Sequence, residues 1–283
     1  ISYKAFDTEI KGGRQRIKID NDRFIGNVGW RQMEQTFDSV LVTNTSVENL
    51  TLKAGYIGRA QNIFSIQDDI EMPFFNINYK IQDFASITAY GLWLADYQAL
   101  AKSTQTLGLA VTGSTKINKN LKLHYRAEYS YQSGYSKNPN SFDLSRYHLM
   151  AGASLVGVTF KAAVEELGAS GTNSFQTPLG TNHAFQGWAD LFLTTPQGGI
   201  RDVQAILSGK VIGTKLMFVY HNFQSVTNSI DYGNEYDFLI TKKFGKHYSL
   251  LAKYAFYDAY ENNGYAKFNK DVHKFWLQAN VSF

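Results

Sequence analysis

The chain alternates apolar and polar side chains in one segment after another, and this pattern limits the folds that are open to it. Alternation at period two is typical of a β-strand with one apolar and one polar face. Most segments have the roughly 9–11 residues that a tilted membrane-spanning strand requires. The expected strands, about fifteen in number, cover residues 1–6, 8–19, 37–46, 50–60, 74–81, 85–96, 104–116, 121–133, 146–156, 158–167, 200–212, 214–224, 235–244, 248–260 and 272–283.

The connections between these segments alternate strictly between short and long. Short ones lie near Asp7, 47–49, 82–83, 118–120, Gly157, Gly213 and 245–247, and long ones span about 20–36, 62–73, 97–103, 134–145, 168–199, 225–234 and 261–271. Short turns on one side and long loops on the other follow the plan of outer-membrane barrels. We therefore predict an all-β fold, a transmembrane antiparallel β-barrel that forms a single domain over residues 1–283.

The last segment fits a wall between lipid and a watery lumen. Phe275, Leu277, Ala279, Val281 and Phe283 share one face, whereas Lys274, Trp276, Gln278, Asn280 and Ser282 share the other. Outer-membrane barrels also end on such a strand, whose terminal aromatic residue serves as an assembly signal. Taken alone, the segment is equally compatible with the last strand of a soluble sandwich.

Composition supports the membrane interpretation only in its barrel form. Hydrophobic residues make up 44% of the chain, and no apolar run approaches the roughly 20 residues of a membrane helix. Only helices and closed barrels satisfy every backbone polar group in lipid. We therefore expect the protein to lie in the outer membrane of a Gram-negative bacterium, surrounded by outer-membrane lipid.

The number of strands predicts an incomplete barrel. If the last strand ends on the short-turn side, the first segment also descends toward that side. Fifteen strands in this arrangement cannot close an even antiparallel barrel, unless residues 1–6 do not form a separate strand. One further strand would give sixteen and three would give eighteen, so we expect N-terminal strands that this chain lacks.

The polar faces of the strands are rich in cations. Charged side chains that face lipid cost roughly 2–4 kcal/mol each at the membrane midplane, so we assign them to the lumen. The lumen set contains Arg14, Arg16, Lys18, Lys53, Lys80, Lys122, Arg126, Lys161, Lys210, Lys215, Lys253 and Lys274, with few acids: Glu128, Glu165 and Asp237. Such a lumen attracts anions and repels cations. Alternatively, these charges only keep a solvated lumen wet.

Three of these cations, Arg14, Arg16 and Lys18, fall on one face of one expected strand. Without partners they would repel one another. They need either acidic partners or an anionic solute.

Two segments resemble the alginate export family of outer-membrane barrels. The first runs from Gly13 to Asp38 and includes Arg23-Phe24-Ile25-Gly26-Asn27, and the second runs from His183 to Pro196. These motifs cover about a fifth of the chain, whereas the strand plan resembles the family throughout. The resemblance implies an eighteen-stranded monomeric barrel with an arginine-rich, anion-selective lumen narrowed by loops, hence three missing strands. It places Arg14, Arg16, Arg23 and Arg31 among the lumen or constriction cations.

The long loops are candidates for a constriction. Loop 168–199 combines six glycines with Trp188 and three phenylalanines, so we predict that it folds inward and buries these rings. Its candidate constriction residues are His183, Phe185, Trp188 and Asp190. The alternative is a loop packed outward as a cap. Loop 20–36 mixes opposite charges with Trp30, which suits either a salt-bridged plug or a purely structural loop.

The sequence shows no pattern typical of an enzyme. None of the six histidines has a metal-ligand spacing, and no Gly-x-Ser-x-Gly elbow or phosphate-binding loop is present. Asp68, Asp69 and Glu71 suit either a calcium site or, more simply, a solvated loop. The cations are dispersed through strands, which argues against binding of nucleic acid. We expect no catalytic activity, no cofactor and no metal.

The sequence therefore predicts a monomeric outer-membrane channel for anionic or small polar solutes or a polysaccharide. The predicted selectivity residues are Arg14, Arg16, Lys18, Arg23, Arg31, Lys53, Lys122, Arg126, Lys161, Lys210 and Lys253. The alternative is a barrel plugged by its loops that serves in surface binding or in assembly with envelope partner proteins.

Overall fold

Fifteen strands form one sheet in which each strand pairs antiparallel with its neighbour along the chain. The computed structural model describes residues 1–260 and 265–283. The strands are β1 (Ser2–Ala5), β2 (Thr8–Gln15), β3 (Thr36–Asn44), β4 (Leu50–Gln61), β5 (Gln67–Ile81), β6 (Ala85–Asp96), β7 (Thr104–Lys116), β8 (Leu121–Gly134), β9 (Asp143–Leu155), β10 (Val158–Leu167), β13 (Ile200–Val211), β14 (Thr214–Gln224), β15 (Asp231–Phe244), β16 (Tyr248–Ala259) and β17 (Val272–Val281). The predicted all-β fold with fifteen strands is confirmed.

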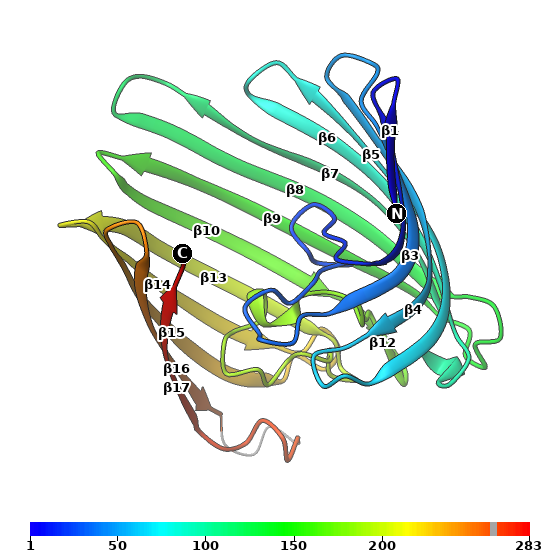
Figure 1. Cartoon of the computed structure of the whole chain (residues 1–283). Helices are drawn as coiled ribbons and strands as arrows, with labels where there is room; N and C mark the ends of the chain where they lie inside the picture. Colours follow the sequence, from blue (N-terminus) through cyan, green and yellow to red (C-terminus); the bar gives the residue numbers. More distant parts are fainter. Residues whose placement is uncertain (261–264) are drawn as a thin grey trace.

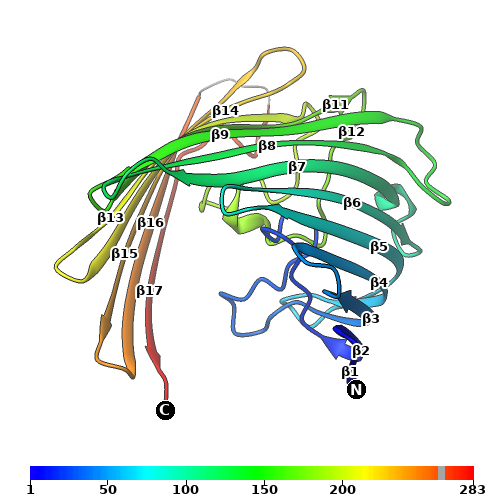
Figure 2. The ribbon, with the colours of Figure 1, turned by 90° about the horizontal axis from the view of Figure 1, so that it is seen from above.

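The sheet curves into a trough, with the loops that follow β2 and β10 lying on its concave side (Figures 1 and 2). The edges of the sheet are β1 and β17, which face each other across an opening in Figure 2. The loop after β10 contains a small hairpin, β11 (Ala169–Ser170) with β12 (Asn173–Ser174), and a short 3-10 turn, η2 (Asn182–Ala184). A second such turn, η1 (Leu100–Lys102), follows β6.

The short connections are tight because their backbones adopt the twist that hairpins favour. Val156-Gly157 and Ile212-Gly213 have positive φ at both positions, as a type I′ turn requires. These turns follow β9 and β13 and hold the neighbouring strands in register. The short connections predicted at both places are confirmed. Residues 261–264 of the long connection predicted at 261–271 lie outside the described residues.

The convex face is apolar and exposed. Large side chains stand out from it along the whole sheet: Ile10, Val40, Ile77, Leu107, Leu109, Leu149, Phe160, Leu207, Ile240, Leu250, Phe275 and Leu277. A continuous exposed apolar surface of this kind is what lipid requires of a barrel wall. Leu277 has 73% of its surface exposed, whereas its neighbour Trp276 contacts the second loop. The predicted facing of the last strand is therefore confirmed.

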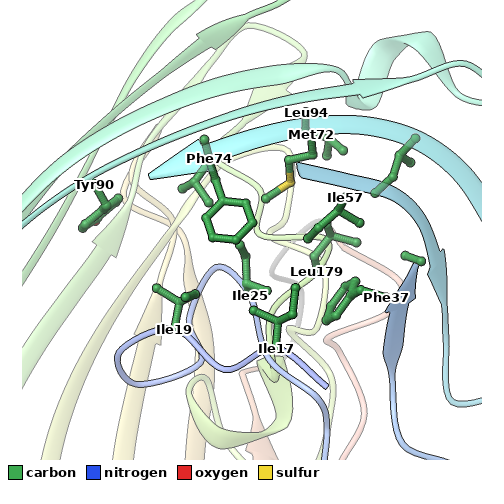
Figure 3. Close-up of a cluster of buried hydrophobic side chains, with 13 residues drawn as sticks. Ile17, Ile19, Ile25, Phe37, Ile57, Met72, Phe74, Tyr90, Leu94 and Leu179 are labelled. Carbon is green, nitrogen blue, oxygen red and sulfur yellow. The ribbon is translucent and has the colours of Figure 1, made fainter. Parts of the chain in front are cut away.

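The concave face holds the core. In Figure 3, Ile17, Ile25 and Leu179 from the two loops pack against Phe37 and Phe74 of the wall. A second cluster includes Phe175, whose ring contacts Phe24 of the loop after β2, and Phe192, which packs on β14 to β16. Burial of these rings stabilises the loops by roughly 1.5–3 kcal/mol for each large side chain. The two loops are therefore part of the folded interior.

Three strands differ from the sequence prediction by four residues or more at one end. β2 ends at Gln15 instead of residue 19, because Ile17 and Ile19 leave the sheet and join the concave core. β5 begins at Gln67 and β15 at Asp231, both earlier than predicted, because polar residues continue these strands past the apolar stretch. Among the described residues, no helix is long and apolar enough to span a membrane.

Candidate functional site: a lumen narrowed by two interlocked loops

Two long loops meet on the concave side of the sheet. We call residues 16–35 the first loop and residues 168–199 the second loop. Leu179 of the second loop accepts hydrogen bonds through its carbonyl from the Gly26 amide at 3.0 Å and from the Gln35 side chain at 2.8 Å. The Thr181 amide donates to the Asp22 carbonyl at 2.9 Å. The two loops therefore form a single interlocked unit, and the second loop folds inward.

A buried ion network ties this unit to the wall. Arg146 of β9 lies between Glu128 of β8 and Glu165 of β10, at N–O distances of 3.0 and 2.5 Å. Arg23 of the first loop reaches the same Glu165 at 3.2 Å, and Arg126 pairs with Glu128 at 2.6 Å. Burial lowers the pKa of Arg23 to about 10, which leaves its guanidinium charged at neutral pH. Each arginine has a carboxylate partner, but three arginines share two carboxylates, so the network keeps one excess positive charge.

The turn at 186–190 of the second loop is held by two carboxylates of β15. The Ala189 amide donates to Glu235 Oε1 at 2.6 Å, and the Trp188 amide donates to Asp237 Oδ2 at 3.1 Å. Gly187, with φ of +75°, lies directly against the Glu235 carboxylate. Any Cβ at this position would come within 2.4 Å of Glu235 Oε2. The close fit leaves room for glycine alone.

Lys253 of β16 lies in a cage of three tryptophans. Its ammonium is 4.0 Å from the ring centre of Trp188, 5.2 Å from Trp276 and 5.7 Å from Trp30. Cations over indole faces are attracted by the ring quadrupole. The cage joins the first loop, the second loop and β17 around one charge.

His183 completes this cage from the second loop. Its Nε2 is 2.7 Å from Lys253 Nζ, and its Nδ1 is 2.5 Å from Asp190 Oδ1. Burial lowers the pKa of His183 despite the hydrogen bond to Asp190. A neutral ring fits both contacts, because Nδ1–H donates to Asp190 while Nε2 accepts from the ammonium. Lys274 of β17 also reaches Asp190, at 3.5 Å.

A cavity of about 900 Å³ opens beside the cage. Its lining includes the faces of Trp30, Trp188 and Trp276, the cations Arg31 and Lys253, and the amides Gln278 and Asn280. The Arg31 guanidinium lies 4.1 Å above the Trp30 ring. Aromatic faces accept sugar or planar rings, cations bind acidic groups, and amides bind hydroxyls. Phe275 and Leu277 of the convex face also line the cavity, so it lies at the open edge of β17. On the concave side of that edge the cavity can hold a polar, anionic solute.

Most of the predicted lumen cations point to the concave face. The strand pairing places Lys53, Lys80, Lys122, Arg126, Lys161, Lys210, Lys215, Lys253 and Lys274 there. Within residues 1–260 and 265–283, Lys80, Lys122, Lys161, Lys210 and Lys215 form no ion pair. The constriction residues His183, Phe185, Trp188 and Asp190 all lie in the inward-folded second loop, and the Arg23 guanidinium stacks 4.5 Å from the Phe185 ring.

The first three predicted cations are placed differently. Arg14 lies on the convex face, opposite to its buried neighbour Gln15, and pairs with Asp38 at 2.7 Å. Arg16 and Lys18 lie beyond the end of β2, where they pair with acids of the first loop, Glu34 at 3.2 Å and Asp22 at 3.1 Å. Their assignment to one lumen-facing strand was wrong. Arg14 shares the convex face of Ile10 within β2, and the chain leaves the sheet after Gln15, so Arg16 and Lys18 do not continue that strand.

Sequence reasoning also missed several buried polar residues. Arg146, Asp202, His221 and Glu235 all fall on the concave face by the same alternation that identified Glu128. Their position at or near the predicted strand ends was the available signal. Two of the three acids considered for calcium have other partners: Asp69 pairs with Arg59 at 2.6 Å, and Glu71 accepts a hydrogen bond from Tyr97 at 2.8 Å.

Comparisons with solved structures agree with this geometry. The chain is similar to OpdQ of Pseudomonas aeruginosa, with a TM-score of 0.77 and 14% identity over 99% of this chain and 79% of that one. A BenF-like porin from Pseudomonas fluorescens Pf-5 gives a TM-score of 0.76 and 14% identity over 98% and 74%. OccAB3 of Acinetobacter baumannii gives 0.77 and 13% over 99% and 76%. At these identities the likeness shows the fold, which is that of outer-membrane porins.

A comparison with curated proteins finds no match. Residues 1–177, more than half of the chain, match the family model described as alginate export. This range contains the first loop and the ion network on β8 to β10. It also contains the first of the two segments on which the resemblance was noted. The chain is therefore a member of the alginate export family, with the fold of an outer-membrane porin.

Proposed function

We propose that the protein is an outer-membrane channel for anionic or small polar solutes, with selectivity from concave-face lysines and a passage narrowed by the two loops. One observation carries this proposal. Lys122, Lys161 and Lys210 face the concave side with no ion pair in the described part of the chain, whereas Glu128 and Glu165 there are fully engaged. Unmatched lumen cations lower the barrier for anions and raise it for cations.

The proposal requires a closed wall. The edges β1 and β17 carry backbone groups that no strand of the main sheet pairs on their outer side. Such edges cannot remain open in lipid. Three further strands between β17 and β1 would close an even, eighteen-stranded barrel, the number that the family resemblance implies. We propose a monomeric barrel of this size.

The cage cavity supports an acidic solute with a ring. Trp30 and Trp188 offer ring faces, and Arg31 and Lys253 offer positive charge at the same place. The structure of OpdK from Pseudomonas aeruginosa was determined with vanillate, a ring with an acidic group. For this chain we propose acidic sugars or ring carboxylates as the solute class, without preference between a small solute and a segment of polysaccharide.

Reversal potential across a salt gradient in a planar bilayer tests the selectivity. The wild-type channel should prefer chloride to potassium. Lys122→Gln, Lys161→Gln and Lys210→Gln together should shift the reversal potential toward the cation side. Arg14→Gln is the matched control, because it removes one cation from the convex face and should leave the potential unchanged. An unchanged potential in the triple variant would show that these lysines do not set selectivity.

A second candidate function rests on the strength of the plug. The interlocked loops and the buried network around Arg146 suit a permanently closed barrel that serves in surface binding or assembly. The two functions differ in conductance. A channel shows discrete single-channel steps, whereas a plugged barrel that folds normally in detergent shows none.

A further inference from the structure

Two pairs of lysines stand directly opposite each other across neighbouring strands. Lys116 of β7 is paired in register with Lys122 of β8, and Lys210 of β13 is paired with Lys215 of β14. All four lie on the concave face beside short turns. Lys122 is on the same face of β8 as Arg126, Lys210 is on the same face of β13 as Asp202, and directly opposite residues share a face. Lys116, Lys210 and Lys215 are exposed and Lys122 is half-buried. Both pairs therefore open into the mouth on the short-turn side.

Like charges directly opposite in an antiparallel pair are destabilising, because their Cβ atoms are only about 4.5–5.5 Å apart. Neither pair has an acidic partner among residues 1–260 and 265–283. Closer to the loops, in contrast, Arg126, Arg146 and Lys274 each pair with a carboxylate. Both pairs of directly opposite lysines therefore lie at the short-turn end, where a bound anion would relieve their repulsion.

The two pairs lie at a distance that one ligand can bridge. The strands β8, β9, β10 and β13 are consecutive neighbours, and Lys122 is level with Ser208 in this register. Lys210 is therefore three strand spacings and two residues away, or about 16 Å. Lys161 of β10 lies between them on the same face. A monovalent anion can contact one pair, whereas an extended multivalent anion can reach both pairs and Lys161 together.

A cavity leads from Lys161, between the two lysine pairs, toward the second loop. Its volume is about 360 Å³, with Lys161 and His124 on the wall side and Phe185 and Trp188 on the loop side. A ligand held at the lysine pairs would therefore lie next to the constriction. The position is on the short-turn side, which faces the periplasm in barrels of this plan.

We propose that the two lysine pairs and Lys161 form a capture site for extended multivalent anions that enter from the short-turn side. The site deepens the proposed channel function and rests on it. Because the capture site lies at one end, the channel should bind multivalent anions more readily from that side. A multivalent anion encounters five lysines without an ion pair in the described chain from the short-turn side. From the other side it first meets the loops, where Arg16, Lys18 and Arg23 are each paired with a carboxylate.

Side-specific block by inorganic tripolyphosphate tests the site in the intact protein. Orientation in the bilayer can be assigned with Asn118→Cys in a short turn, since the chain has no cysteine, and a membrane-impermeant thiol reagent. Half-block should need at least about fivefold less tripolyphosphate from the short-turn side, the factor that one charge contact in water gives. Equal block from both sides of the wild-type channel would overturn the site.

The key variant carries Lys116→Gln, Lys122→Gln, Lys210→Gln and Lys215→Gln. It should lose the side preference, and it should unfold at the same or a higher temperature because the repulsion is gone. The control, Lys137→Gln with Lys270→Gln, removes cations from two long connections and should keep the side preference. Tripolyphosphate should raise the unfolding temperature of the wild-type protein and of the control but not of the quadruple variant.

The outcomes separate the two proposals. A wild-type channel without preference for chloride over potassium would refute the proposed function. An anion-preferring channel whose side preference survives in the quadruple variant would refute only the capture site.

Discussion

Gly187→Ala should loosen the constriction without unfolding the barrel. A non-glycine residue at a positive φ such as +75° costs roughly 1–2 kcal/mol. The added methyl group would also meet the Glu235 carboxylate at 2.4 Å and push it away from the Ala189 amide. Loss of a typical hydrogen bond costs about 0.5–1.5 kcal/mol. Together these terms disfavour the position of the turn against β15 by about 1.5–3.5 kcal/mol, or roughly one to two and a half orders of magnitude in population.

The assay is single-channel conductance in a planar bilayer, with thermal unfolding as the measure of folding. The Gly187→Ala channel should conduct more than the wild-type channel, because the turn that carries Trp188 no longer rests on β15. The unfolding temperature of the barrel should change little, since the strands are untouched. Blocker affinity at the tryptophan cage should fall as well.

Gly171→Ala is the matched control in the same loop. Gly171 also has a positive φ, +59°, but a Cβ there has no neighbour within 4 Å. This variant carries the backbone strain without the clash against the wall, so its conductance should match that of the wild-type protein. The reasoning fails if Gly187→Ala leaves conductance unchanged, or if Gly171→Ala raises it equally.

Three further predictions follow from the loops and the ion network. Arg146→Met should lower the free energy of unfolding by about 1.5–3 kcal/mol in chemical denaturation, because it removes charged hydrogen bonds to two buried carboxylates that still keep Arg23 and Arg126 as partners. Acidification should loosen the second loop. Burial lowers the pKa of His183 when the loop is folded against the wall, so the released loop binds a proton more readily. The inward position is therefore fully stable above the ordinary histidine pKa near 6.5 and becomes less stable below it. Conductance should then rise between pH 7 and pH 5, and His183→Gln, which can still donate and accept, should flatten this response. Deletion of residues 172–197 should raise conductance while the barrel still folds, whereas a loop that caps the barrel from outside would leave conductance unchanged.

The alternation of side chains predicts most of the wall because the wall has a different solvent on each face. Lipid on one side and a polar lumen on the other impose period two on every spanning strand. The facing of Lys122, Lys161 and Lys253 follows from it directly. The rule fails for Arg16 and Lys18, because the chain leaves the sheet after Gln15 and no longer separates two solvents.

The same alternation cannot tell whether an inward charge is paired. Arg126 and Lys122 lie on one face of one strand, yet Arg126 is bound to Glu128 and Lys122 forms no ion pair in the described chain. Arg23 finds its partner Glu165 across a long stretch of sequence, through a loop that folds inward. Whether such a pair forms depends on where the loops lie in the folded protein. The sequence indicated an inward position of the loops only through their aromatic content.

The separation of paired from unpaired charge has a functional consequence. At the level of the loops, the cations Arg23 and Arg146 are neutralised by buried carboxylates. Buried ion pairs add little net stability but are costly to break, so they hold the loops in one place. Unpaired lysines such as Lys210 lie toward the short turns instead. On the proposed function, passage and selectivity are set at different depths. Gly187→Ala should then change conductance at constant reversal potential, whereas Lys210→Gln should do the reverse.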